Sequence, residues 1–457
     1  NNQFYARDDT GYGTLYYNGT IGGSPSSVFI KVYTNGGSGD ILYTNISKAG
    51  GGAYAFTARI PAGLIKYKVQ LYSVTSGTTS LLNTATNIVC GDAYLIDGQS
   101  NAVAYNYGGF TNLTDYTYTS TWIRSYGTQG EGGQGSELIG GWGDATQTNS
   151  TGIGFVGYWG MYIAKQLVDN YKMPICILQG AVGGTLIYQH MPNPTSHADP
   201  ATIYGRLLER VQAANLTHGI RGVMWHQGES DSGSGAPTGD WDYKSYRQYF
   251  VDLTAAWKTD YPNIRYYYEF QVWPQPCSMN PYGDQIREIQ RTLPYMYSNL
   301  RVMSTIGTLP PVWCHTTIDG YVQFGQLLGA LVQKDNYGYV PTTPITAPDI
   351  KQAWFTTTNR TEIALEFDQN MMWDNAFTNF MFLDGAGGKV TSGTVSGNVI
   401  RLQLSGASTN QTITYVKDQV NLNLPVLGTP VMRGSNGIAA LTFADVPIAI
   451  SGSLSAG

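Results

Sequence analysis

Charged side chains are scarce in this sequence. Lys, Arg, Asp and Glu make up 12% of the 457 residues, and the formal net charge is -5. The 26 Lys and Arg residues form no cluster of the kind that proteins use to bind phosphate backbones. We therefore do not expect nucleic acid as a partner.

Long apolar runs and metal-binding cysteine patterns are also missing. No run of about 18 uninterrupted apolar residues occurs, so we expect neither a membrane helix nor a membrane partner. The four cysteines show no C-x-x-C spacing, and we predict no metal and no cofactor. Cys90 and Cys176 lie in or beside apolar runs and are expected to be buried thiols. Cys277 and Cys314 lie in loop-like contexts and either form a disulfide, if the compartment is oxidising, or remain two free thiols.

Glycine and tyrosine are abundant by contrast, with 56 and 34 residues. Short alternating apolar segments separated by Gly-rich turns run from Ser27 to about Thr86, and the same pattern returns beyond about Ile345. This rhythm is typical of β-sandwiches. We predict an N-terminal β-sandwich over residues 1–88 and a C-terminal one over residues 345–457. A low-charge surface of this composition favours a secreted protein, extracellular or periplasmic.

Residues 89–340 alternate between strand-like and helix-like runs. Buried strand patterns occur at 93–97, 174–180, 222–226, 264–272 and 301–307, and helix patterns follow them at 157–171, 201–215, 243–261, 285–293 and 320–333. Such alternation predicts a three-layer α/β domain with a mostly parallel sheet. Because ligands bind beyond the carboxyl ends of these strands, we expect the chemistry in the loops that follow them.

Four of those loops carry residues suited to acyl transfer. GDAYLIDGQSNA places Ser100 at a turn after a strand, AVGGT supplies Gly183 and Gly184, WHQGESD supplies Gln227, and WCHTT places His315 before the last predicted helix. Each alone has an ordinary structural explanation, as a helix cap or a tight turn. Together they supply a nucleophile, oxyanion donors and a general base.

This combination resembles the SGNH hydrolases, in particular the sialate O-acetylesterase-like branch, which includes carbohydrate acetylesterases. The resemblance runs from about Cys90 to Gly329, and flanking β-domains are usual in that branch. It implies that Ser100 is the nucleophile and His315 the general base. It also implies that the amides of Ser100 and of Gly184 or Gly183, together with the side chain of Gln227, stabilise the oxyanion.

The sequence departs from the family pattern at one place. The family usually has an Asp two or three residues before the histidine, where this chain has Val312 and Trp313. Glu229 and Asp231 are candidates for the acid that orients the histidine, or for supporting positions behind the site. We predict that His315 works in a dyad, with Nδ1 held by a backbone carbonyl near Val312 or by Glu229.

Aromatic residues near the predicted site favour a sugar as substrate. Tyr188, Trp313 and Trp159 are predicted to contact it. The sequence therefore predicts a bacterial carbohydrate O-acetylesterase, with an acetylated polysaccharide or glycan as partner. Two alternatives remain open: an inactive hydrolase that acts as a carbohydrate-binding module, and an acyltransferase that uses the same chemistry.

Overall fold

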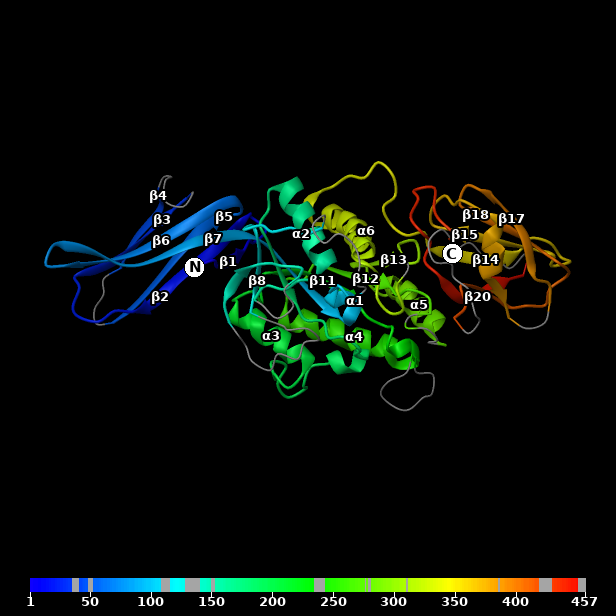
Figure 1. Ribbon diagram of the computed structural model, residues 1–457, viewed down its shortest axis with the longest axis horizontal. Coiled ribbons are helices and arrows are strands. Elements are labelled where there is room, and N and C mark those ends of the chain that lie inside the picture. Colours follow the sequence, from blue (N-terminus) through cyan, green and yellow to red (C-terminus); the bar gives the residue numbers. More distant parts are fainter. Residues whose placement is uncertain are drawn as a thin grey trace.

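The computed structural model describes residues 1–34, 41–47, 52–107, 116–127, 140–148, 153–233, 243–275, 277, 281–309, 311–384, 387–418 and 430–450. Two all-β regions flank a central region that contains all six α-helices of this described part (Figure 1). Each region has its own cluster of buried apolar side chains. Parts of the Gly-rich segment between Tyr105 and Gly154 lie outside the described residues.

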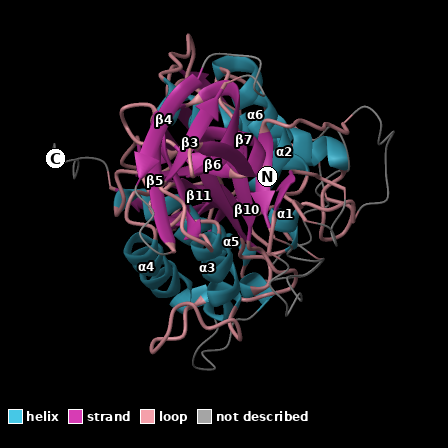
Figure 2. Ribbon diagram, turned by 90° about the vertical axis from the view of Figure 1, so that its left-hand side faces the viewer, coloured by secondary structure: helices cyan, strands magenta, loops and turns pink. Residues whose placement is uncertain are grey.

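The N-terminal region, which faces the viewer in Figure 2, consists of a two-stranded sheet and a larger sheet that is antiparallel except for the parallel pairing of its first strand. The strands are β1 (Phe4–Ala6), β2 (Tyr12–Thr20), β3 (Ser27–Tyr33), β4 (Ile41–Ser47), β5 (Ala53–Pro61), β6 (Gly63–Thr75) and the first part of β7 (Thr78–Gly98). β2 pairs with β5, while β3 lies between β4 and β6, and β6 pairs with β7. Alternate residues of β3, Val28, Ile30 and Val32, are fully buried because a strand points every second side chain to the same face.

Strand β7 joins the N-terminal and central regions. Its first residues are exposed and pair with β6, whereas its last eleven, from Ile88 to Gly98, are buried. From Asp92 onward the strand pairs with β10 and β11 of the central sheet. The predicted boundary between residues 88 and 89 therefore falls inside one continuous strand. At this joint Arg7 pairs with the buried carboxylate of Asp92 at 2.8 Å.

The central sheet is parallel, as predicted. Its strand order is β13-β12-β11-β7-β10-β8-β9. The bounds are β8 (Ile123–Tyr126), β9 (Trp142–Asp144), β10 (Ile175–Gln179), β11 (Ile220–His226), β12 (Tyr266–Gln271) and β13 (Leu300–Ser304). β9 alone is antiparallel to its neighbour in this order. All five predicted strands are present, because continuous apolar runs mark strands that are buried on both faces.

Helices lie on both sides of this sheet (Figure 1). They are α1 (Ser100–Val103), α2 (Tyr158–Tyr171), α3 (Ile203–Ala213), α4 (Tyr243–Asp260), α5 (Gly283–Thr292) and α6 (Ile318–Tyr337), with short 3₁₀ turns at Ile187–His190, Asp231–Gly233, Leu293–Tyr295 and Asn375–Phe380. α2 packs against α6 on one side, and α3 and α4 lie on the other (Figure 1). The five predicted helices correspond to α2 through α6.

The described residues of the C-terminal region form a sheet of seven strands in the order β16-β19-β20-β14-β15-β18-β17. Their bounds are β14 (Ile350–Phe355), β15 (Glu362–Phe367), β16 (Met381–Leu383), β17 (Val390–Ser396), β18 (Val399–Leu404), β19 (Thr412–Tyr415) and β20 (Phe443–Ala449). Arg287 of α5 forms a buried ion pair with Asp418 at 2.8 Å, which attaches this region to the central one. A pair without solvent contact fixes the relative position of the two elements, because losing either partner would leave a buried charge.

Candidate active site

The turn after β7 presents Ser100 at the carboxyl edge of the sheet. Gly98 has φ +129°, and a Cβ at this position would lie 2.2 Å from the carbonyl oxygen of His226, so only glycine fits. The Gln99 amide donates to that same carbonyl at 2.9 Å. Ser100 then opens the short helix α1 with a side chain that is 9% exposed. The predicted Gly-x-Ser turn is thus a tight, backbone-constrained junction.

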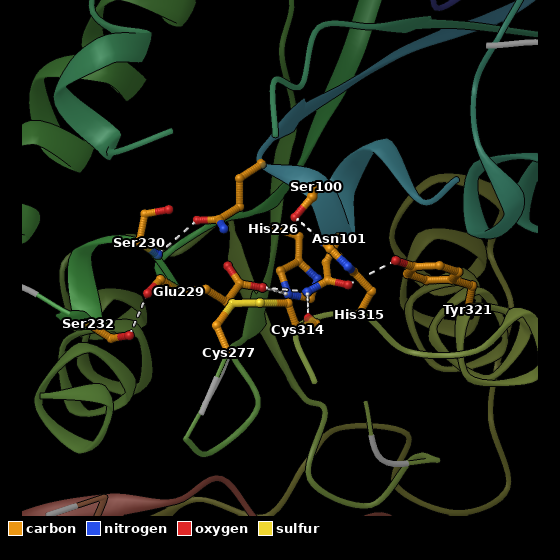
Figure 3. The surroundings of a disulfide bond; sticks show 11 residues. Ser100, Asn101, His226, Glu229, Ser230, Ser232, Cys277, Cys314, His315 and Tyr321 are labelled. Atoms are coloured by element: carbon orange, nitrogen blue, oxygen red, sulfur yellow. Dashed lines mark hydrogen bonds and ion pairs between the residues drawn. A yellow bond between two sulfur atoms is a disulfide. The ribbon is translucent and has the colours of Figure 1, made fainter. Parts of the chain in front are cut away.

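His315 lies against Ser100, although 215 residues separate them in the sequence. The distance from His315 Nε2 to Ser100 Oγ is 2.8 Å, within hydrogen-bonding range (Figure 3). His315 comes from the segment between β13 and α6. A disulfide between Cys277 and Cys314 anchors that segment, and the Val312 amide donates to the His315 carbonyl at 2.8 Å.

The disulfide resolves the alternative that the sequence left open, since Cys277 and Cys314 are bonded (Figure 3). Cys90 and Cys176 are buried free thiols, as predicted. Burial raises the pKa of the Cys90 thiol to about 12. A protonated thiol of this kind is a poor nucleophile, so Cys90 is a packing residue.

Tyr107 stacks on the imidazole of His315. The two ring centroids are 4.3 Å apart and the rings are inclined by 28°. Sequence reasoning missed this residue, because it lies in the Gly-rich segment after α1, where no periodic pattern identifies a contact. The stacked ring limits rotation of the imidazole and shields it from water.

Asn101 links the nucleophile turn to both neighbouring loops. Its side-chain amide donates to Glu229 Oε1 at 2.8 Å and to the Cys314 carbonyl at 3.0 Å, and its Oδ1 accepts from the Tyr321 hydroxyl at 2.9 Å (Figure 3). Every polar atom of this buried side chain is therefore used. Asn101, which follows Ser100, thus holds Cys314, which precedes His315. This hydrogen bond fixes the spacing of nucleophile and base.

Glu229 lies behind this contact and carries a negative charge. Burial raises the pKa of its carboxyl, but His226, with Nε2 3.0 Å from Oε1, and the Asn101 hydrogen bond outweigh burial and lower the pKa below its usual range. Burial lowers the pKa of His315, and the Glu229 charge partly opposes that effect. His315 is consequently neutral at neutral pH, which is the state that a general base requires.

No hydrogen bond to Nδ1 of His315 occurs within the described part of the chain. Neither the carbonyl near Val312 nor the Glu229 carboxylate, both named by the sequence analysis, bonds to it there. Glu229 instead acts on the histidine through the Asn101 bridge and through its charge. The predicted dyad remains a prediction, and Glu229 is placed as a supporting residue.

The glycine loop after β10 passes close to Ser100 and supplies candidate oxyanion donors. A Cβ on Gly183 would lie 3.5 Å from the Ser100 Cβ, so the glycine loop passes beside the nucleophile. Gly184 has φ +73°, a left-handed conformation that glycine adopts without strain. Among the described residues, the amides of Ser100, Gly183 and Gly184 donate to no other group. They are available to a developing oxyanion.

Gln227 has partners other than those that the sequence analysis expected. The side chain is fully buried, and its amide nitrogen contacts the Thr185 carbonyl at 3.0 Å, Gln99 Oε1 at 3.2 Å and the Asp231 carboxylate. An amide has only two hydrogens, so these acceptors occupy both. Instead of pointing to an oxyanion, Gln227 ties the glycine loop to the turn after β11.

Asp231 supports the same loop. Its Oδ2 accepts from the Ile187 amide at 3.1 Å and from Gln227, and burial raises the pKa of its carboxyl to about 7. Among the described residues it makes no contact with His315, and the nearby charge of His190 lowers its pKa and partly opposes the effect of burial. Asp231 therefore positions the glycine loop and leaves the histidine to other groups.

The three predicted sugar-binding aromatics have different environments. Trp313 is 68% exposed and lies two residues from His315, and Tyr188 is half-buried in the 3₁₀ turn after the glycine loop. Trp159 is 0% exposed, packs on Phe270, and donates from Nε1 to the Asn101 carbonyl at 2.9 Å. The prediction for Trp159 is wrong, because an enclosed side chain cannot touch a ligand.

Within the described residues, no group of three or more His, Cys, Asp or Glu side chains could hold a metal ion. None of the helices described there is long and apolar enough to cross a membrane.

The fold is similar to that of a known carbohydrate esterase. Among curated sequences, none matches the chain significantly. A carbohydrate acetylesterase from Xanthomonas citri shares the fold, with a TM-score of 0.65 and 16% identity over 97% of both chains. NanS is 19% identical over 47% of this chain and 78% of its own, with a TM-score of 0.35. A protein from Arabidopsis thaliana is 20% identical over 54% of this chain and 99% of its own, with a TM-score of 0.41.

A family model described as carbohydrate esterase, sialic acid-specific acetylesterase, matches residues 91–334. The match covers more than half of the 457 residues and includes Ser100, both loop glycines and His315. The chain therefore belongs to this family of carbohydrate esterases.

Proposed function

We propose that this protein is a carbohydrate O-acetylesterase that removes acetyl groups from a polysaccharide or glycan through an acyl-serine intermediate. The observation that carries the proposal is the 2.8 Å contact between Ser100 Oγ and His315 Nε2, beside the free amides of Gly183 and Gly184. A serine hydroxyl is a weak nucleophile until a hydrogen-bonded imidazole accepts its proton.

In the first half-reaction, Ser100 Oγ attacks the ester carbonyl carbon while its proton moves to His315 Nε2. Negative charge develops on the carbonyl oxygen, and the amides of Ser100, Gly183 and Gly184 donate to it. One such donor contributes about 3–4 kcal/mol in comparable sites. Collapse of the tetrahedral intermediate breaks the bond to the sugar oxygen, which takes the proton from His315 and leaves as a hydroxyl.

In the second half-reaction, water takes the place of the sugar. His315 accepts a proton from the water, whose oxygen attacks the acetyl carbon and forms a second oxyanion at the same amides. Collapse returns the proton from His315 to Ser100 Oγ and releases acetic acid, which loses its own proton to solvent and becomes acetate. The stack of Tyr107 on His315 and the tether at Cys314 keep the imidazole in place through both steps.

The acyl group is proposed to be small. Gly183 approaches the Ser100 side chain closely, and the half-buried Tyr188 follows the same loop. Little room is left for added methylenes, so acetyl esters are preferred to butyryl or longer ones. The exposed Trp313 is positioned to stack on the sugar that carries the ester.

The disulfide also bears on the compartment in which the enzyme works. Disulfides persist in oxidising surroundings, and a bond adjacent to the catalytic base would be lost in a reducing one. This supports the proposal that the enzyme is secreted, either extracellular or periplasmic. The alternative of an inactive hydrolase is not favoured, and the hydrogen-bonding distance between Ser100 and His315 supports an active enzyme.

The test combines two assays. p-Nitrophenyl esters of increasing chain length are hydrolysed first, and acetate release from a panel of acetylated xylans, pectins, glucomannans and sialosides is then measured. The proposal predicts turnover that falls steeply from acetyl to butyryl and acetate release from at least one glycan. Faster cleavage of octanoyl esters, or no acetate from any glycan, would contradict it.

A further inference from the structure

A large cleft lies on the side of the central region opposite the active site. Its volume is about 1100 Å³, and β2 forms one wall. The facing wall comes from the segments that precede β11 and β12, with lining residues such as Asn215 and Asn263. Ser100 and Gln227 follow the carboxyl ends of these parallel strands, so the cleft borders the amino ends. Residues 90–98 of β7 run between the two places and span about 26 Å.

Two exposed tyrosines line the β2 wall. Tyr12 and Tyr16 are 41% and 58% exposed, and they lie on the same face of the strand as Thr14 and Asn18, because alternate residues share a face. Tyr12 and Tyr16 are four positions apart along the strand, so their Cα atoms lie about 13 Å from each other. This spacing suits the length of a short oligosaccharide. Phenol rings set along a strand form a platform for flat, extended ligands.

The ring of Tyr12 is held in position from one side. The Arg59 guanidinium lies over it, 5.1 Å from the ring centroid, and Arg59 itself pairs with Asp8 at 2.8 Å. With one face covered by the arginine, the other face remains for a ligand. A preset ring loses less conformational entropy on binding than a freely rotating one.

The charged groups of the cleft largely neutralise one another. Arg7 and Arg221 share the buried carboxylate of Asp92, and Arg265 pairs with Asp9. Lys258 donates to the Ile264 carbonyl at 3.1 Å. The cleft keeps only a small net positive charge. A surface that binds a phosphate polymer is much more basic.

Hydrogen-bonding side chains fill the rest of the facing wall. Gln212, Asn215 and His218 are exposed there, and each both donates and accepts. Hydroxyl groups of a sugar also donate and accept, whereas an apolar ligand would leave these groups unpaired. Aromatic faces on one wall and amides on the other match a pyranose chain.

We propose that this cleft is a second carbohydrate site, which binds a polysaccharide chain and keeps polymeric substrate on the enzyme. The choice of ligand class rests on the proposed function, while the site itself rests on the geometry of the cleft. Because the cleft is remote from Ser100, it contributes to the binding of long chains and has no part in the chemical step. Small esters do not reach both places at once.

The test uses full-length protein with Tyr12→Ala and Tyr16→Ala combined. Binding is measured by affinity electrophoresis in gels that contain xylan, glucomannan or polygalacturonate, in a Ser100→Ala background so that the polymer stays acetylated. Retardation by at least one polymer is expected, with affinity at least about tenfold lower in the double variant. Tyr12→Phe combined with Tyr16→Phe keeps the rings and should retain binding, and Tyr339→Ala, at another exposed tyrosine, serves as the matched control.

Kinetics with Ser100 intact separate this proposal from the proposed function. p-Nitrophenyl acetate turnover of the double alanine variant should stay within about twofold of wild type, while KM for an acetylated polymer rises about tenfold. Normal ester turnover without tyrosine-dependent binding of any polymer would overturn the second site and leave the esterase proposal intact. Tyrosine-dependent binding without any ester turnover would support the second site and overturn the esterase proposal.

Discussion

Asn101 donates a hydrogen bond to Oε1 of Glu229 at 2.8 Å, and this contact joins the turn of the nucleophile to the loop after β11. The same amide holds the Cys314 carbonyl at 3.0 Å. The buried carboxylate of Glu229 therefore acts on His315 in two ways. It holds the Asn101 side chain that lies between them, and its charge creates an electric field at the imidazole. The arrangement separates two roles that one Asp performs in a full triad, namely holding the imidazole and stabilising its charge.

Glu229→Gln should move the acid limb of the kcat/KM profile to lower pH. The carboxylate raises the pKa of His315, so its removal lets burial lower that pKa further. Since the base works when neutral, the variant keeps activity at more acidic pH than wild type. The acid limb of the wild-type profile already lies below the usual pKa of histidine. Turnover above the limb should fall by less than about tenfold. A pair of pH–rate profiles measures both effects, and a thousandfold loss would mean that Glu229 is a true third member of the site.

Gly184→Ala should lower kcat by about 10- to 100-fold, with a smaller change in KM. An alanine at φ +73° is strained, and relief of that strain turns the amide away from the oxyanion. Steady-state kinetics on p-nitrophenyl acetate provide the measurement. Gly338→Ala is the matched control, because its φ is +71° at the end of α6, away from Ser100. Equal losses in both variants would indicate a general folding defect and contradict the assigned donor.

Reduction of the Cys277–Cys314 disulfide should destabilise the protein and slow the enzyme. The bond closes a separation of 37 residues, for which about 2–4 kcal/mol of unfolding free energy is typical. Activity should fall as well, because Cys314 directly precedes His315, the proposed general base. Thermal unfolding and ester turnover are measured with and without dithiothreitol. A variant with Cys277→Ser and Cys314→Ser should not respond to the reductant, and unchanged wild-type activity after full reduction would refute the positioning role.

Glu269→Gln should stabilise the protein at neutral and alkaline pH. Glu269 is fully buried in β12, and burial raises the pKa of its carboxyl well above the usual range. A raised folded-state pKa means that stability is greatest below the unfolded-state pKa and declines as pH rises toward the folded one. Gln does not titrate, so the gain over wild type should grow from pH 4 to pH 8. Denaturant unfolding at both pH values tests this, and a constant difference would show that ionisation is not the cause.

The pattern of residues was sufficient to predict the central sheet and the position of its reactive groups. Continuous apolar runs marked β10 through β13. Residues that follow the carboxyl ends of parallel strands lie at the same edge of the sheet, and for this reason Ser100 and His315 could be predicted to lie close together. The junction between the first two regions was harder to locate. β7 continues from an exposed, alternating stretch into a buried one without a turn, so no composition break marks where the central region begins.

Contacts that depend on packing could not be read from the sequence. Tyr107 reaches His315 from a segment with no periodicity, and Asn101 gains its role only when three loops close around it. Trp159 belongs to the first turn of α2, where the sequence does not show which side of the helix faces the sheet. The Gln227 amide was assigned to the oxyanion by resemblance, yet its position is set by acceptors on neighbouring loops.

The most direct test of the account is the turnover of Ser100→Ala on p-nitrophenyl acetate, measured beside Ser230→Ala. Ser230 is a nearby serine whose backbone amide bonds to Gln99 and whose hydroxyl does not contact His315 (Figure 3). Loss of the nucleophile should lower kcat by at least about 10⁴-fold while the fold is kept, and the Ser230 variant should stay close to wild type. Turnover of Ser100→Ala within about tenfold of wild type would show that the acyl-serine mechanism is wrong.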